Sequence, residues 1–362
     1  MDRRGFVRGA ALGAPAAGLL AAPRLASAQP QVQWRLASSF PKSTDVLWGV
    51  AELLQRRVSE LTGGAFQIRI FAAGEIVPAL QVLDAVGGNN VEMGHTASYY
   101  YIGKDPSLGF GTEMPFGMNA RQHYSWIREG GGHDVMEEVF RDQNVVALPA
   151  NNTGAQMGGW FRKEIRSVDD LKGLKFRIGG TGGMVLTKLG VIAQQLGATD
   201  IYPALERGVI DGAEWVGPHD DEKLGFHRVA QYYYFPGWWE PCSQGEFLIN
   251  ARAWEVLPKQ YQQVLEVVSG ETTIWSTARY DMLNVAALRR LIAGGAQLRG
   301  YTRDVLAACY RATQETYAEL GDRNPRFKRV HAHWDRFRRD TQSWFRVAED
   351  SSANFLALAE RS

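Results

Sequence analysis

Arg177 is the side chain best suited to hold a small anion. It lies at the end of the apolar stretch 174–178, which alternates like a strand. A planar guanidinium can hold a carboxylate through two parallel hydrogen bonds, so a carboxylate ligand is the chemistry that this residue favours. The alternative is a structural salt bridge between Arg177 and a glutamate of the same chain, with Glu214 as a partner in an empty cleft.

Three further side chains, from separate segments, could hold a cation. Gln156 offers an amide oxygen, and Glu214 and Glu240 offer carboxylates, with the backbone carbonyl of Trp215 as a possible fourth oxygen. An all-oxygen set of this kind suits a hard cation such as Na⁺ or Ca²⁺ better than Zn²⁺. Glu240 follows a run of aromatic residues, where an unpaired charge would be costly, so it needs a partner.

The elements that position these residues predict an α/β fold, and the length of 362 residues favours two domains or one large one. Strands at 32–37, 66–71 and 91–95 alternate with helices at 44–61 and 79–86, and a β-α-β-α-β series favours a mainly parallel sheet with helices on its faces. Further strands are expected at 145–149, 174–178 and 247–250. Further helices are expected at 184–196, 302–320 and 331–359, with one long helix at 261–291.

Two segments bring the candidate residues to strand ends. Residues 151–156 form a polar turn directly after the strand at 145–149, and ligands in open α/β sheets bind at the carboxyl ends of strands. In the second segment, residues 201–215, Pro203 suits the first turn of a short helix and Gly208 suits its C-terminal stop. A tight turn at 211–212 then leads into Glu214 and Trp215.

The stretch 201–215, with its Gly-Val-Ile-Asp-Gly motif, resembles the signature of the extracytoplasmic receptors of TRAP transporters (tripartite ATP-independent periplasmic transporters). A second block at 167–177 (Ser-Val-Asp-Asp-Leu-Lys-Gly-Leu-Lys-Phe-Arg) is similar to that family and ends on Arg177, where family members carry an arginine that grips the ligand carboxylate. The resemblance covers nearly the whole mature chain. It implies a periplasmic receptor that closes on a small ligand and delivers it to a membrane permease.

The resemblance also implies a domain arrangement. We expect residues 29–150 and 245–300 to form domain I and the long helix that spans both domains, and residues 151–244 to form domain II. Residues 301–362 would be C-terminal helices and a possible dimerisation segment.

One branch of that family, which binds 2-oxo and 2-hydroxy acids, resembles this chain at Gln156, at Glu214-Trp215 and at the aromatic run ending in Glu240. In that branch a cation bridges protein and ligand. This implies a small 2-oxo monocarboxylate such as pyruvate or 2-oxobutyrate, with lactate next. The metal ligands would be Gln156, Glu214, Trp215 and Glu240, with Na⁺ first and Ca²⁺ second. The residues that contact the ligand would be Arg177, Gln156, Asn152, Tyr100 and Trp215, of which Asn152 and Tyr100 are the weaker candidates.

Residues 1–28 are typical of an export signal of the twin-arginine type. Arg3-Arg4 precedes an Ala/Leu/Gly-rich stretch, and Ala26-Ser27-Ala28 predicts cleavage after Ala28 and a periplasmic location. Removing this segment takes away four arginines and one aspartate, which changes the net charge from +1 to −2. The remaining chain has no basic block that would favour nucleic acid and no apolar run of about 20 residues that would favour a membrane span. Cys242 and Cys309 could pair or remain buried thiols.

The C-terminal segment 331–359 carries a heptad-like seam. Its members recur at spacings of four and three: Val330, Trp334, Phe337, Thr341, Trp344, Ala348, Ser351 and Phe355. Such a seam needs a partner surface, either on its own domain or on a second subunit, and the second alternative predicts a homodimer.

No motif for catalysis is present in the sequence. There is no Gly-x-Ser-x-Gly elbow, no recognisable Ser/His/Asp set and no H-E-x-x-H spacing among the seven histidines. We therefore expect a binding protein and not an enzyme. The alternative is an exported metal-dependent enzyme acting on 2-oxo or 2-hydroxy acids, which would need a general acid or base beside the metal.

Overall fold

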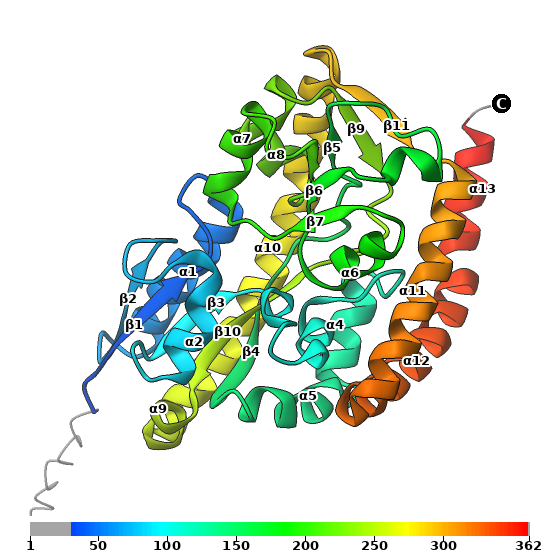
Figure 1. The fold of residues 1–362 in the computed structure, drawn as a ribbon. Helices are drawn as coiled ribbons and strands as arrows, with labels where there is room; N and C mark the ends of the chain where they lie inside the picture. The colour runs from blue at the N-terminus through cyan, green and yellow to red at the C-terminus, as the bar shows by residue number, and fades with distance from the viewer. Residues whose placement is uncertain (1–29, 361–362) are drawn as a thin grey trace, which may run out of the picture.

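The computed structural model describes residues 30–360 and contains two mixed β-sheets covered by helices (Figure 1). The predicted export signal lies outside the described residues. In spatial order the first sheet consists of β2 (Phe66–Phe71), β1 (Val32–Ser38), β3 (Met93–Thr96), β10 (Gln244–Asn250) and β4 (Val145–Asn152). The second consists of β11 (Gln297–Gly300), β9 (Tyr232–Phe235), β5 (Trp160–Phe161), β8 (Gly212–Ala213), β6 (Lys175–Arg177) and β7 (Ile192–Gln194).

The first sheet confirms the predicted β-α-β-α-β series. Strand β1 pairs in parallel with both β2 and β3, and β10 pairs antiparallel with β3 and β4. The residues of β2 alternate between buried and exposed at its start, as a strand with one covered face requires. The helices of this half are α1 (Asp45–Leu61), α2 (Val82–Gly87), α3 (Gly109–Thr112), α4 (Ala120–Arg128), α5 (Gly132–Arg141) and α9 (Ala251–Val256).

The second sheet brings Arg177 and Glu214 to the same edge. Strand β6 pairs in parallel with β7 and β8, so that Arg177 lies opposite Ala213, the residue before Glu214. Around this sheet lie α6 (Gly180–Lys188), α7 (Ala198–Glu206), α8 (Pro218–Leu224) and α11 (Arg303–Arg323). Strand β11 pairs with β9, so residues 297–300 contribute to the second sheet although they were predicted in domain I. The division into two domains itself stays a prediction.

The long helix α10 (Lys259–Ala293) confirms the helix predicted at 261–291 and runs from the first sheet to the second (Figure 1). Its beginning packs into the core of the first half through Tyr261 and Leu265, and its end packs into the core of the second half through Tyr280 and Leu291. The same helix thus supports both halves of the molecule.

Two local predictions were wrong. Residues 184–196 do not form one helix, because α6 ends at Lys188 and Gly190, with a φ of +90°, turns the chain into β7. Pro203 is not in the first turn of its helix, because α7 already begins at Ala198, and the proline is tolerated inside the helix at the cost of one backbone hydrogen bond. The stop at Gly208 is confirmed by its φ of +71°.

The predicted C-terminal seam divides into two parts. In α12 (Pro325–Phe345), Val330 and Trp334 are buried in the core of the first half of the chain, beside α4 and α5. Beyond Arg338 the seam is exposed through the π-helical turn Arg346–Asp350 and α13 (Ser351–Ala359), and Phe355 is 68% exposed. Own-domain packing therefore describes the first part of the segment, whereas the large apolar side chains Trp344, Val347 and Phe355 of the second part are exposed.

Candidate functional site

Arg177 and Glu214 form a buried ion pair at the carboxyl ends of β6 and β8. The Arg177 Nη1 atom lies 2.5 Å from Glu214 Oε1 and 2.7 Å from the Glu214 carbonyl oxygen. The backbone N–H of Gly179 also donates to Glu214 Oε1, at 2.9 Å. Both side chains are essentially inaccessible to solvent. The alternative in which Glu214 pairs with Arg177 is therefore the arrangement that the structure contains.

The ion pair leaves one terminal polar atom of each side chain available. Nη2 of Arg177 and Oε2 of Glu214 have no hydrogen-bond partner within residues 30–360, although both are buried. The ring of Trp215 lies 5.0 Å from the guanidinium carbon, an approach that fixes the plane of the arginine. Arg177 thus keeps a donor for a ligand while its position is fixed by Glu214, Trp215 and the carbonyl of Leu196.

Gln156 and Glu240 come together through the backbone. The N–H of Gln156 donates to the carbonyl of Glu240 at 3.2 Å, and each side chain has one buried oxygen without a partner, Oε1 of Gln156 and Oε2 of Glu240. Burial, followed by the repulsion of nearby Glu214, raises the pKa of Glu240 well above its usual range. Burial also raises the pKa of Glu214, against the attraction of Arg177. Two such carboxyls strongly favour a compensating cation.

Asn152, at the end of β4, is positioned by the first sheet. Its backbone N–H donates to Ser276 Oγ of α10 and its Oδ1 atom accepts from the N–H of Gly154, at 3.0 and 2.9 Å. Its Nδ2 donor has no partner in the described part of the chain. Buried polar side chains are normally paired. Donors on Asn152 and Arg177 and oxygens on Gln156, Glu214 and Glu240 fit a carboxylate held together with a hard cation.

A small cavity of about 20 Å³ lies where the two halves meet. It is lined by residues from both halves: Phe40, Leu47, Ala97, Tyr99, Tyr100, Asn151, Thr153, Gln156, Trp215, Val216, Ser243 and Gly245. The cavity therefore adjoins Tyr100, Gln156 and Trp215 of the predicted set. Its size, which corresponds to about one water molecule, shows the two halves packed closely together.

Sequence reasoning missed several residues of this region. Tyr99 packs so closely on Gly179 that a Cβ atom there would lie 2.1 Å from the tyrosine ring. Phe40 and Ser243 line the cavity from segments that no motif marked. The signal that could have identified Tyr99 is the Gly179-Gly180 pair after Arg177, because adjacent glycines at a strand end indicate a close approach of another group.

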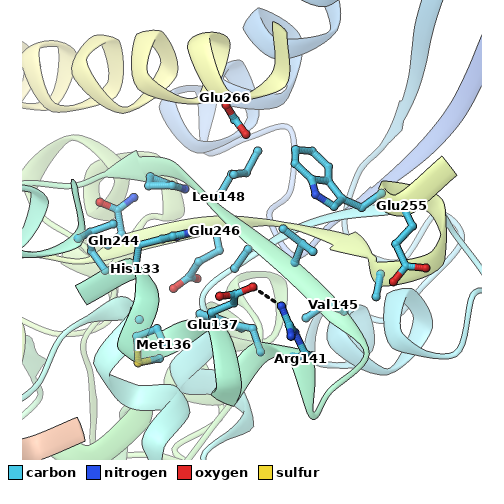
Figure 2. Close-up of a pocket in the computed structure, with 18 residues that line it drawn as sticks. His133, Met136, Glu137, Arg141, Val145, Leu148, Gln244, Glu246, Glu255 and Glu266 are labelled. Carbon is cyan, nitrogen blue, oxygen red and sulfur yellow. Dashed lines mark hydrogen bonds and ion pairs between the residues drawn. The ribbon is translucent and has the colours of Figure 1, made fainter. Parts of the chain in front are cut away.

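A larger cavity lies elsewhere, beneath β4 and β10 of the first sheet (Figure 2). Its volume is about 440 Å³, and Figure 2 shows Glu246 at its floor, the ion pair of Glu137 with Arg141, and Glu255 and Glu266 at its rim. Glu246 accepts hydrogen bonds from the N–H and Oγ of Ser98, and burial raises its pKa to about 8. None of the predicted site residues lines this cavity.

The two cysteines are both free and buried, so they do not pair. None of the helices in residues 30–360 is long and apolar enough to cross a membrane.

Comparisons with known proteins identify the family of this chain. Residues 37–324 match the family model "Bacterial extracellular solute-binding protein, family 7". The chain belongs to this family, the solute-binding receptors of TRAP transporters. Receptors of this family are periplasmic and bind solutes rather than transform them.

Three proteins are similar to this chain over most of its length. A monocarboxylate 2-oxoacid-binding periplasmic protein of Nostoc is 49% identical over 91% of both chains. A TRAP solute-binding protein of Bordetella bronchiseptica is also 49% identical, with a TM-score of 0.90 over 92% of this chain and 100% of that one. It is a dimer with calcium and picolinate in one of its sites. A third, from Pseudoalteromonas atlantica, holds sodium and pyruvate, at 34% identity and a TM-score of 0.87 over 90% and 99% of the two chains.

Proposed function

We propose that this chain is the periplasmic receptor of a TRAP transporter for a small 2-oxo monocarboxylate, which it binds through Arg177 and a cation. The observation that carries the proposal is the set of unpaired buried atoms. Two donors, Arg177 Nη2 and Asn152 Nδ2, accompany three oxygens, on Gln156, Glu214 and Glu240. A 2-oxo acid with its cation supplies acceptors for the former and positive charge for the latter.

The chemistry of a 2-oxo acid suits this division of roles. Its keto oxygen and one carboxylate oxygen can chelate a cation, while the other carboxylate oxygen accepts from Arg177. Gln156, Glu214, Glu240 and the Trp215 carbonyl would hold the cation, which supplies charge that offsets the buried carboxylates. Sodium is our first candidate and calcium the second, and relatives hold one or the other.

The walls of the proposed site support a small ligand. Aromatic rings of Phe40, Tyr100 and Trp215 line a cavity with little free volume, which favours a short side chain on the ligand. Pyruvate and 2-oxobutyrate are therefore our preferred ligands, with lactate next. This ranking agrees with the 2-oxoacid binding of the Nostoc relative and the pyruvate held by the Pseudoalteromonas relative.

Three further parts of the proposal concern the assembly. The chain is exported by the twin-arginine route with cleavage after Ala28, releases its ligand to the TRAP permease, and forms a homodimer through its C-terminal helix. The exposed end of that helix and the dimer of the Bordetella relative support the last point.

Calorimetric titration of the mature protein with pyruvate tests the proposal. The titration is run in sodium-free buffer after exhaustive chelation, and repeated with added sodium or added calcium. One-to-one binding that is restored by one of these cations supports the receptor and identifies the ion. Absence of binding to pyruvate, lactate and longer 2-oxo acids in every buffer would overturn it. Recovery of chemically altered ligand would instead favour the metal-dependent enzyme.

A further inference from the structure

The cavity beneath β4 and β10 has the size of a ligand pocket and is separate from the proposed 2-oxo acid site (Figure 2). Its volume of about 440 Å³ lies within the range of about 300–1,000 Å³ that is usual for small-molecule pockets. It shares no lining residue with the small cavity where the two halves meet. Strand β10 separates the two cavities, because Gln244 and Glu246 line the large one whereas Gly245 lines the small one.

Gln244 gives the large cavity a buried acceptor. The residue is 2% exposed. Its Nε2 atom donates to the carbonyl oxygens of Asn151 and Gly245, at 2.7 and 2.9 Å, so turning the amide round would lose both bonds. The remaining atom, Oε1, has no hydrogen-bond partner in the described part of the chain. Because buried polar atoms are normally paired, this oxygen is suited to accept from a ligand.

Glu246 gives the same cavity a buried carboxyl group. The residue is 4% exposed, and its two oxygens accept from Oγ and N–H of Ser98, at 2.8 and 2.9 Å. A carboxylate has about four acceptor positions, so these two bonds leave room for a ligand donor. Burial raises the pKa of Glu246 to about 8, and no charged side chain among residues 30–360 shifts that pKa. A cation brought by a ligand would therefore be the first to balance this carboxylate.

The other charged groups around the cavity also favour a cation. Four glutamates belong to its lining: Glu137, Glu246, Glu255 and Glu266. Among the described lining residues the positive charge comes from Arg141, which is already paired with Glu137, and His133 is the remaining titratable group. A negatively charged pocket repels carboxylate ligands and attracts cations.

The remaining walls are mainly apolar. They include Ile127, Met136, Phe140, Val145, Leu148 and Trp254. Such walls can bury a hydrocarbon body, and the faces of aromatic rings attract cations. A bare metal ion needs six to eight oxygen ligands or bound waters, which apolar walls do not supply. The combination favours an organic cation with N–H donors.

We propose that the large cavity is a second ligand site, which binds a primary alkylammonium ion. An ammonium group has three N–H donors, which suit Gln244 Oε1 and the unused acceptor positions of Glu246, while the alkyl body lies against the apolar walls. Glu246 ionises when the ammonium binds and gives its proton to the solvent, so that an ion pair replaces a neutral carboxyl group. The inference goes beyond the proposed function and does not depend on it.

A ligand-observed NMR titration with n-butylammonium tests the site. Saturable one-to-one binding with a dissociation constant below about 10 mM is expected, which a ligand of this size can reach. 1-Butanol has the same body without the charge, and tetramethylammonium has the charge without N–H donors. Both are expected to bind at least about 10-fold more weakly, because hydrogen bonds to charged groups are the strong ones. In weakly buffered solution at pH 7, binding of n-butylammonium should release about one proton.

Two variants locate the binding. Glu246→Gln keeps the shape of the side chain, and should weaken n-butylammonium binding at least about 10-fold and abolish the proton release. Ala147→Leu narrows the cavity from β4 and should also weaken binding. The matched control is Glu164→Gln, which removes a carboxylate that pairs with Arg166 and Arg299 outside the cavity and should leave binding unchanged. Thermal unfolding and pyruvate titration report whether each variant is folded.

The outcomes separate the possible errors. Absence of saturable n-butylammonium binding, equal binding of 1-butanol, or undiminished binding by folded Glu246→Gln overturns the ammonium site. Competition between n-butylammonium and pyruvate also overturns it, because the two ligands would then share one site. The 2-oxo acid proposal fails separately, if pyruvate, lactate and longer 2-oxo acids do not bind, and that failure leaves the ammonium titration unaffected.

Discussion

Two cavities of this protein, the one beneath β4 and β10 and the one at the junction of the two halves, differ in size and in the state of their polar groups. The cavity beneath β4 and β10 has about 440 Å³, whereas the one at the junction of the two halves has about 20 Å³. Within the described chain, Gln244 Oε1 is the one buried side-chain polar atom lining the large cavity that lacks a partner. Six residues of the proposed site each carry such an atom, namely Asn152, Gln156, Arg177, Glu214, Trp215 and Glu240. We therefore base the proposed binding site on unpaired polar atoms and not on cavity volume, because buried polar side chains are normally paired.

The largest effect is expected from removing the guanidinium of Arg177. We call the proposed site around Arg177 and Glu240, where the two halves meet, the junction site. Arg177→Met should raise the dissociation constant of pyruvate by about 30-fold to several thousand-fold, because truncating one partner of a buried charge pair costs about 2–5 kcal/mol. Arg177→Lys restores the charge without the planar fork and should recover part of the affinity. Calorimetry measures both.

Arg166→Met serves as the control, since Arg166 is exposed and pairs with Glu164 outside the site. If Arg177→Met binds pyruvate as tightly as wild type while remaining folded, the junction site is not the carboxylate site.

A smaller effect is expected from the cation. Glu240→Gln removes one of the proposed ligands and should raise the cation concentration needed for half-maximal pyruvate binding by at least about 10–100-fold, the cost usual for a residue that merely supports a metal ligand. Titrating the cation at fixed pyruvate measures it. Glu137→Gln makes the same change at the large cavity and should leave the cation concentration for half-maximal pyruvate binding unchanged. Equal effects of the two changes would remove the distinction between the cavities.

Much of the fold and part of the proposed site could be predicted from the sequence, because the signals are local. The alternation at 66–71 and the helix between two strands predict the parallel pairing of β1 with β2 in the first sheet. In the second sheet, the parallel pairing of β6 with β8 brings Arg177 and Glu214 to one edge. What could not be predicted depends on contacts between distant segments. The close contact of Tyr99 with Gly179 is one case. The large cavity is another, because its lining residues come from β4, β10, α5, α9 and α10. The helix at 184–196 was wrong because the left-handed turn at Gly190 outweighs the helical periodicity around it.

The large cavity should influence stability rather than pyruvate binding, through Glu246. Burial raises its pKa to about 8, above that of an exposed glutamate, so the folded protein keeps a proton that the unfolded chain loses. The contribution of Glu246 to stability is therefore greatest below about pH 4.5 and is lost as pH rises towards 8. Glu246→Gln, which stays neutral, should reduce this fall, by of order 1–3 kcal/mol at pH 7.

Chemical denaturation at pH 5 and pH 8 measures the effect, with Glu255→Gln at the exposed rim as the control. The same pH dependence in wild type and Glu246→Gln would show that Glu246 is not the group responsible.

The smallest effect is expected from filling the large cavity. Ala147→Val adds two methyl groups on β4, where Ala147 lines the cavity and its main chain pairs with Leu248. Because the space beside it is open, the change should alter the free energy of unfolding by less than about 1.5 kcal/mol and the pyruvate affinity by less than about twofold. Calorimetry and denaturation of the same preparation measure the two quantities separately. A loss of pyruvate affinity without a loss of stability would mean that the strand pair β4–β10, which ends at Asn152 beside the junction site, transmits the occupancy of one cavity to the other.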